Sequence, residues 1–492
     1  MTITKYLSAA LLTVLAASCS EGLMDDINKN NGNPAAGTVD AKFSITGIIM
    51  NTAFQTVSGD YAFYTSSYTE QEFGTGNNQL ATVETRGKSE TASSSTFDNV
   101  WNSTYTTLRA VKEVEEKCAE GGLNEGQLDV LGVAQVLKVM NWAILTDMHG
   151  DIPYSEALKG QDCLNPKLDS QETIYADLQT TLDAAIENLS NATTDHLGSQ
   201  DLLFNGDSQS WIGLAYALKA RLALHTQFRD ANAFAKALEY ANAAKDAGFT
   251  GAELTTFDSN NYNPWTEYFV DRLYVGCSST VTNLMEERND PREDIYVCPY
   301  FGSYDVPNPG DVTSARSTET LPAPSWLYNE TCSIHMFSYS ELEFIIAECK
   351  ARLGQDASAD MAEGIRASFA DFQTSDGGVL GVTFTDEQVD EYIAALPVTL
   401  NEIMVQKYLS QIRDEQVEAY NDIRRAKANG EEFVKMTNPN NNGSTGNLWP
   451  LRLPYGNSDV RSNPNIREAF GSGNDAGEYI FTDNVWWAGG SR

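Results

Sequence analysis

Apolar residues recur at every third or fourth position through most of residues 97–250, the spacing that gathers them on one face of an α-helix. Helices are predicted to begin near residues 97, 124, 169 and 207, and a fifth ends at Gly248. Their expected N-terminal caps are Asn124 with Gln127, Asp169 with Glu172, and Asp207 or Ser208. Residues 130–145 are apolar on nearly every side, which places this helix at the centre of the core. Gly150 and Pro153 are expected to end it.

A second helical block begins near Ser338 and continues through residues 357–374 and 398–428. Paired amphipathic helices of this length predict a mostly α-helical protein with a tetratricopeptide-like scaffold. Residues 211–220 weakly match one repeat of that kind.

Residues 251–337, between the two helical blocks, are rich in proline and aromatic residues. Long irregular segments inside compact proteins usually serve a function, so this region is expected to form a ligand-binding face. Residues 437–492 are rich in Asn, Gly and Pro and are expected to wrap the surface. We therefore predict one domain over residues 41–492, with its helical scaffold at about 97–250 and 338–428.

The first nineteen residues have the pattern of an exported lipoprotein. The apolar run of residues 6–17 is shorter than the ~20 residues that cross a bilayer. Small residues precede Cys19, and this arrangement resembles a bacterial lipobox, in which the cysteine is acylated. Leu15 lies one place earlier than that pattern expects, so an ordinary cleaved signal with an incidental cysteine remains the alternative. We predict a signal peptide over residues 1–18, lipidation of Cys19 as the sole membrane anchor, and a flexible tether over 19–40.

The charge of the chain limits its partners. It carries 33 basic and 68 acidic side chains, a formal net charge of 33 − 68 = −35. This balance argues against nucleic acid and anionic lipid headgroups, because phosphate binding requires a basic surface. Neutral ligands such as sugars, and cationic ligands, remain compatible with it.

No catalytic motif is present: the histidines lack H-E-x-x-H, and there is no G-x-S-x-G. The six cysteines after Cys19 form no C-x-x-C pair; Cys118 and Cys349 are expected in the core, and any disulfide pairing is open. Residues 438–443 resemble half of a calcium loop, but its glutamate position holds Trp449. We predict no cofactor and no metal centre, with a structural calcium left open.

Several segments, in order along the chain, closely resemble motifs of the SusD/RagB family of Bacteroidetes outer-membrane lipoproteins. They are residues 146–158 (TDMHGDIPYSEAL), 204–222, 289–292, 340–348 (SELEFIIAE), 406–408, 418–425, 451–455 (LRLPY) and 485–487. We interpret these motifs as mainly structural. Arg292 is expected to pair with a buried acid, and Arg424 and Arg425 with Asp422.

The resemblance implies a nutrient-binding protein that is not an enzyme. Members of the family cap a SusC-like TonB-dependent transporter and pass nutrients, usually oligosaccharides, into it. The resemblance also implies that the tetratricopeptide-like helices pack against the transporter and that the irregular segments form the ligand site. The acidic run after Cys19 resembles a surface-export signal, which implies the outer face of the outer membrane.

Candidate ligand residues are aromatic side chains expected to be exposed in the irregular segments. An aromatic ring can cover the apolar face of a sugar while neighbouring polar groups bind its hydroxyls. The candidates are Tyr61, Tyr64, Tyr68, Tyr262, Trp265, Tyr268, Trp326 and Tyr328. Trp265 is the strongest, because Pro264 fixes its loop. Ordinary packing of these rings is the alternative, and a peptide binder or, with less support, a surface glycosidase are the alternative functions.

Overall fold

The computed structural model describes residues 38–75, 79–299, 302–311, 321–441 and 448–492. The chain divides into two compact units, residues 1–40 and 41–492. The predicted signal peptide and Cys19 lie outside the described residues, as do Asn442 and Gly443 of the calcium-like pattern. Lipidation of Cys19 therefore remains a prediction, and calcium binding at residues 438–443 remains open.

Helices dominate the unit formed by residues 41–492, which confirms the prediction of a mostly α-helical protein. The helices are α3 (Lys42–Asn51), α4 (Asp60–Tyr68), α5 (Gln79–Glu84), α6 (Lys88–Thr91), α7 (Asp98–Cys118), α8 (Leu128–His149), α9 (Gln171–Asn191), α10 (Ser208–His225), α11 (Ala233–Asp246), α12 (Pro264–Arg272), α13 (Ser279–Glu286), α14 (Glu293–Tyr296), α15 (Tyr339–Arg352), α16 (Ser358–Asp376), α17 (Asp386–Ala395), α18 (Leu400–Ser410), α19 (Gln416–Ala428), α20 (Asn457–Ser462), α21 (Pro464–Phe470) and α22 (Tyr479–Thr482). Short antiparallel strand pairs join β1 (Glu72–Gly74) to β5 (Val275–Cys277), β2 (Ile152–Pro153) to β3 (Leu168–Asp169), and β4 (Ala252–Leu254) to β6 (Ile334–Phe337).

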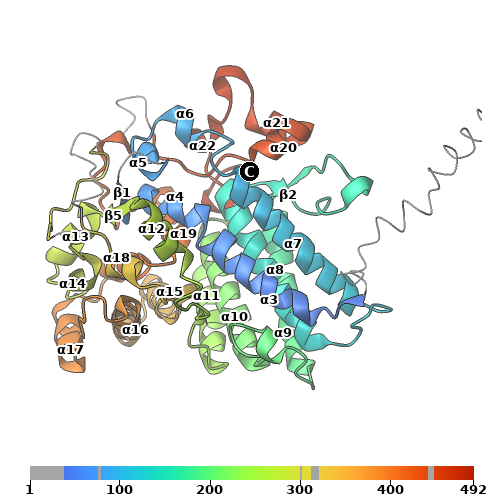
Figure 1. The fold of residues 1–492 in the computed structure, drawn as a ribbon, viewed down its shortest axis with the longest axis horizontal. Helices are drawn as coiled ribbons and strands as arrows, with labels where there is room; N and C mark the ends of the chain where they lie inside the picture. Colours follow the sequence, from blue (N-terminus) through green and yellow to red (C-terminus); the bar gives the residue numbers. More distant parts are fainter. Residues whose placement is uncertain (1–37, 76–78, 300–301, 312–320, 442–447) are drawn as a thin grey trace, which may run out of the picture. The chain divides into compact units, whose positions relative to one another are not determined.

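The long helices pack in chain order, α7 against α8, α8 against α9, α9 against α10 and α10 against α11 (Figure 1). Contact between α11 and α15 joins this block to the second, in which α15 packs against α16 and α18. Packing of each helix on its chain neighbours is typical of helical-repeat proteins. It agrees with the tetratricopeptide-like scaffold that the sequence predicts.

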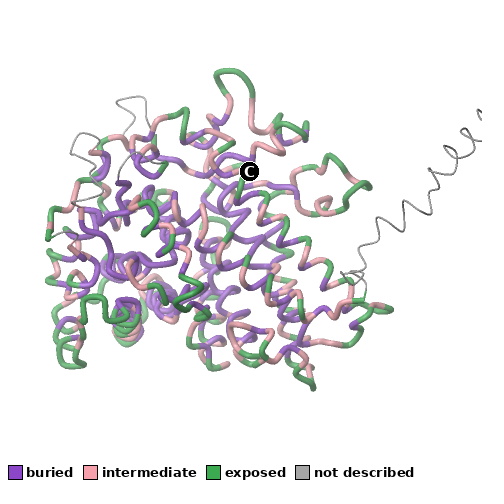
Figure 2. Tube along the Cα trace, viewed as in Figure 1, coloured by how far each residue is buried: buried purple, intermediate pink, exposed green. Residues whose placement is uncertain are grey.

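Helix α8 is a core helix. Nearly all of its side chains are buried, as its apolar sequence predicts. It is long and apolar enough to cross a membrane, but burial of those side chains inside the protein accounts for the composition. It ends at Gly150, whose φ of +81° favours glycine. Figure 2 shows buried residues along the packed helices and exposed ones in the loops and on α17.

The predicted helix caps are partly confirmed. The Asp207 carboxylate caps α10 by accepting hydrogen bonds from two backbone N–H groups of the first turn. Ser170, rather than Asp169, caps α9. Gln127 occupies the cap position of α8 without a side-chain hydrogen bond, so the expected pair of Asn124 and Gln127 is wrong.

Arginines of the family-like motifs are buried and hydrogen-bonded. Nε of Arg292 donates to the Asp290 carboxylate at 3.0 Å, which confirms its expected acidic partner. Arg425 pairs with Asp422, also as expected. Arg424 instead donates to backbone carbonyl oxygens, so its predicted pairing with Asp422 is wrong. Consecutive helix residues point roughly 100° apart, so two adjacent arginines of α19 do not share one partner.

The six cysteines after Cys19 lie in the described residues and are free thiols. Cys163 is half-buried and the other five are buried. Cys118 and Cys349 belong to the core, as predicted. The core of residues 41–492 is therefore assembled without a disulfide among these six.

Candidate ligand-binding site

The first turn of helix α12 fixes this helix beside α4. Asn263 Oδ1 accepts a hydrogen bond from the backbone N–H of Trp265 at 2.8 Å, and Pro264 takes the first helical position, where no N–H is needed. The indole Nε1 of Trp265 donates to the carbonyl oxygen of Ser58 at 2.7 Å, just before α4 begins. Trp265 is only 8% exposed. Its ring therefore anchors α12 and is not open to a ligand.

The end of α12 brings Tyr274 to the same place. Leu273 ends the helix with a φ of +51°, a left-handed conformation that turns the chain toward β5. The backbone N–H of Thr75 then donates to the carbonyl oxygen of Tyr274 at 2.9 Å, next to the paired strands β1 and β5. Strand pairing thus joins the loop-rich region to the segment that follows α4.

Three half-buried rings meet where α4, α12 and the start of β5 come together. We call Phe63, Tyr268 and Tyr274 the aromatic cluster. The ring centroids of Phe63 and Tyr268 are 5.2 Å apart with the planes at 83°, and those of Tyr268 and Tyr274 are 5.7 Å apart at 71°. Such edge-to-face contacts are favoured by aromatic pairs. The ring centroids of Trp265 and Phe63 are 6.0 Å apart, so the buried Trp265 ring supports the partly exposed rings of the cluster.

Asp60, in the first turn of α4, adds a carboxylate beside the aromatic cluster. Burial raises the pKa of Tyr268 to about 12, and the nearby charges of Tyr274 and Asp60 contribute to that rise. The pKa values of Tyr64 and of Asp60 itself are also raised by burial, and the Asp60 charge adds to the rise at Tyr64. The Asp60 carboxylate has no hydrogen bond or ion pair with any of the residues that the structure describes. It is therefore available to accept a hydrogen bond from a ligand.

Most of the rings predicted to bind a ligand are not accessible. The side chains of Tyr61, Tyr64, Tyr68, Trp265 and Trp326 are buried. The Tyr61 hydroxyl is hydrogen-bonded to Nε2 of His149 at 2.7 Å, and the Trp326 ring packs edge-on against Phe372. The expectation that these five rings are exposed is wrong, because they pack into the core.

Tyr262, Tyr268 and Tyr328 are the accessible members of the predicted set. Of these, only Tyr268 belongs to the aromatic cluster. The Tyr328 ring packs against Phe269 at 4.8 Å, and Tyr262 is 37% exposed with no aromatic partner among the described residues. Ligand contact by any of the eight rings remains a prediction.

Three residues of the site, Phe63, Asp60 and Tyr274, were missed by the sequence reasoning. The signal for Phe63 was present, because Tyr61, Tyr64 and Tyr68 have the i, i+3, i+7 spacing of a buried helix face. A helix through these tyrosines turns Phe63 away from their face. No comparable pattern marks Asp60 or Tyr274, which depend on contacts between distant segments.

The arrangement suits a ligand with an apolar face and several hydroxyl groups. The rings can cover the apolar face, the Asp60 carboxylate can accept hydrogen bonds, and the tyrosine hydroxyls can donate or accept them. Within the described ranges, no three His, Cys, Asp or Glu side chains come together as a set that could hold a metal ion.

Comparisons with known proteins give the site a context. A SusD-like family model, described as starch-binding and associating with the outer membrane, matches residues 41–456. The chain is similar to a solved SusD/RagB family protein from Bacteroides thetaiotaomicron VPI-5482, with 33% identity, a TM-score of 0.83, and coverage of 92% of this chain and 100% of that chain.

Two chitin-binding proteins of known structure share the fold at lower identity. One, described as a chitin-binding protein, has 23% identity and a TM-score of 0.72, and the match covers 92% of this chain and 99% of that chain. The other, a chitin-binding SusD homolog from Flavobacterium johnsoniae, has 19% identity and a TM-score of 0.68, with coverage of 90% and 98%. No curated protein sequence matches the chain.

Proposed function

Because the chain belongs to the SusD/RagB family, we propose that it is a cell-surface lipoprotein that binds a glycan and delivers it to a SusC-like TonB-dependent transporter. The aromatic cluster beside the unpaired Asp60 carboxylate is the observation that carries the binding role. The description of the family as starch-binding supports a carbohydrate ligand. The protein acts by binding and does not break bonds.

The chemistry of the cluster favours an oligosaccharide over an anionic nutrient. A net charge of −35 opposes anionic ligands, whereas a sugar is neutral. A pyranose ring offers C–H groups to Phe63 and Tyr268 and hydroxyl groups to Asp60. Edge-to-face packing holds the rings in place before the ligand arrives, which reduces the entropy lost on binding.

The membrane and transporter parts of the proposal rest on the N-terminus and the family. Residues 1–19 have the lipoprotein pattern, and the family description places its members at the outer membrane. Lipidation at Cys19 would tether the binding domain through residues 19–40, so that it can reach a transporter in the same membrane. Metabolic labelling with palmitate should mark the wild-type chain and not Cys19→Ala.

Binding is tested by screening the purified protein on a glycan array and titrating the best glycan by calorimetry. Tyr268→Ala should weaken binding at least about tenfold, the effect of removing a contact worth ~1.4 kcal/mol. Phe43→Ala is the matched control, because Phe43 is an exposed ring on α3 outside the cluster. A glycan array without hits together with binding of a peptide, or equal affinity of Tyr268→Ala and wild type, would contradict the proposal.

A further inference from the structure

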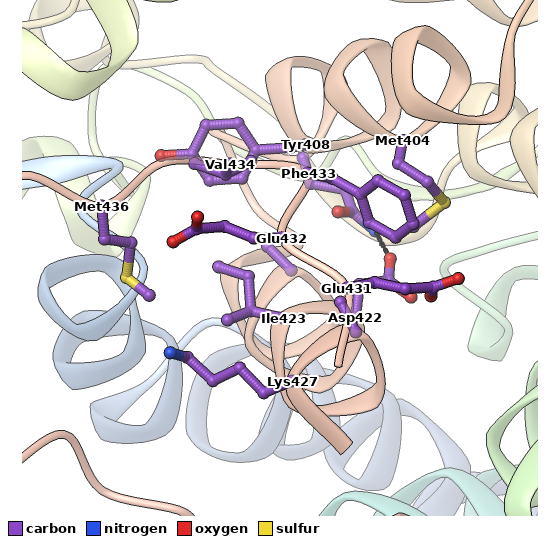
Figure 3. Close-up of a pocket in the computed structure, with 13 residues that line it drawn as sticks. Met404, Tyr408, Asp422, Ile423, Lys427, Glu431, Glu432, Phe433, Val434 and Met436 are labelled. Carbon is purple, nitrogen blue, oxygen red and sulfur yellow. Dashed lines mark hydrogen bonds between the residues drawn. The ribbon is translucent and has the colours of Figure 1, made fainter. Parts of the chain in front are cut away.

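A cavity separate from the aromatic cluster lies between α18, α19 and the segment that follows α19. Its volume is about 240 Å³. Figure 3 shows Tyr408, Val434 and Phe433 along one side, with Met404 beside the Phe433 ring and Met436 at the other end. The cavity shares no lining residue with the aromatic cluster.

Apolar side chains form most of the cavity wall. Ile423, Ala419 and Ala426 line it from α19, together with the methionines and the Phe433 ring. The hydroxyl of Tyr408 is already used, because it donates to the carbonyl oxygen of Thr69 at 2.9 Å. The wall therefore suits an apolar body and offers it flexible, polarizable methionine contacts.

One residue that lines the cavity, Gln411, carries a buried acceptor without a partner in the described residues. Gln411 is 1% exposed, and its Nε2 donates to Asp422 Oδ2 at 3.4 Å, whereas its Oε1 has no hydrogen-bond partner within the described residues. Asp422 is held by Lys407 at 2.8 Å and by Arg425. A buried oxygen without a donor is unfavourable and rare in native proteins, so Gln411 Oε1 points to a group that supplies one.

Three charged side chains, Lys427, Glu431 and Glu432, also line the cavity (Figure 3). Glu431 is paired with Arg352 at 2.8 Å, and Lys427 lies 5.0 Å from the centre of the Trp449 ring. Glu432 is exposed, so solvent accommodates its carboxylate. The ligand needs no charge of its own to satisfy them.

We propose that this cavity binds a small, neutral, one-ring molecule that carries a hydroxyl or N–H group, which donates to Gln411 Oε1. An apolar cavity of about 150 Å³ is enough to bind benzene, so about 240 Å³ accommodates a ring with a polar substituent. The site is independent of the glycan-binding proposal, and each can fail without the other.

The test compares 4-fluorophenol with fluorobenzene, which has the same ring without the donor. Fluorine NMR titration of the full-length chain in detergent should show 4-fluorophenol binding about fivefold more tightly, the effect of one net hydrogen bond. Ala426→Leu should fill the cavity and abolish binding of both probes. Because the cavity is filled in this variant, any signal change that remains measures partition of the probes into the detergent.

Gln411→Met, which removes the acceptor and keeps the side-chain length, should bind both probes equally. The comparison of the two probes on the wild-type chain stands even where a variant folds poorly. Equal affinity of the two probes for the wild type, or signals that Ala426→Leu leaves unchanged, would overturn the proposal.

Discussion

Polar groups are paired with one another in the charged core of the protein, whereas a carboxylate is left without a partner at the aromatic cluster. In the charged core, between α10, α15, α18 and α19, Nε of Arg221 donates to Glu341 at 2.8 Å, and Nη2 of Arg425 lies 2.9 Å from Glu348. These partners are buried and satisfied by one another. At the aromatic cluster, the Asp60 carboxylate has no partner in the described chain, and the rings stay half-exposed.

This difference indicates that the charged core is part of the scaffold and that the aromatic cluster is a binding site. The charged core contains the segments that resemble the family, residues 340–348 and 418–425, and its side chains hold helices together. The aromatic cluster lies outside those motifs, so the family resemblance does not specify it. Groups left unpaired at a surface have capacity for a ligand, whereas groups paired in the interior have none.

The largest effect is expected in the charged core. Arg425→Ala removes one buried partner from Glu348 and from Asp422 and should lower the free energy of unfolding by roughly 3 kcal/mol in urea denaturation. Arg352 and Lys407 still pair with these two carboxylates, which keeps the loss at the lower end for a broken buried pair. The matched control is Arg366→Ala, which breaks the exposed pair with Asp390 and should cost less than about 1 kcal/mol. Similar losses in both variants would remove the distinction between buried and exposed pairs.

Trp265→Ala tests the support beneath the aromatic cluster. Because the ring is buried and its indole N–H is bonded to Ser58, the change should destabilise the protein by about 3 kcal/mol and weaken glycan binding as well. Tyr268→Ala should weaken binding with a much smaller loss of stability. Thermal unfolding and calorimetry on both variants separate the two roles, and an unchanged Tm for Trp265→Ala would show that the ring is no anchor.

The charged core should also lose stability at high pH. Burial alone would lower the pKa of His225, but the carboxylates of Glu418 and Asp147 outweigh it and raise the pKa to about 9. The folded protein holds this proton more tightly than the unfolded chain, so the stabilisation is complete below about pH 6.5 and is lost as the pH rises through 9.

Tm measured from about pH 6 to pH 10 should therefore fall in the wild type, and it should fall less in His225→Gln. Binding of glycan by the aromatic cluster should not follow this titration below the pH at which the protein unfolds. Parallel Tm profiles for the two proteins would contradict the assignment to His225.

The smallest effect is expected at Tyr262. Its ring is exposed and lies outside the cluster, so Tyr262→Ala should change stability by no more than about 0.5 kcal/mol and leave glycan affinity unchanged. A clear loss of affinity by calorimetry would extend the site from the aromatic cluster to the loop before α12.

Local patterns predicted most of the helices but little of the site. The 3.6-residue periodicity located α7 to α11 and α15, and the all-round apolar run located the buried α8. The same rule applied to Tyr61, Tyr64 and Tyr68 would have indicated a buried stripe instead of three exposed rings. That error came from treating residues before 97 as irregular.

The remaining parts of the site depend on contacts that no local pattern encodes. Tyr268 and Tyr274 are close in the sequence, but they meet Phe63, about two hundred residues earlier in the chain, where β5 pairs with β1. Gln411 lines the cavity of the further inference because α18, α19 and the segment after α19 pack together there. Such long-range pairings follow from the packed fold, and a single sequence does not display them.

The central claim is that the aromatic cluster is the glycan-binding surface. Its most direct test is a calorimetric titration of the double variant Tyr268→Ala/Tyr274→Ala with the glycan that the wild type binds best. We predict that binding becomes too weak to measure while the Tm stays close to that of the wild type. Wild-type affinity in the folded double variant would contradict the claim.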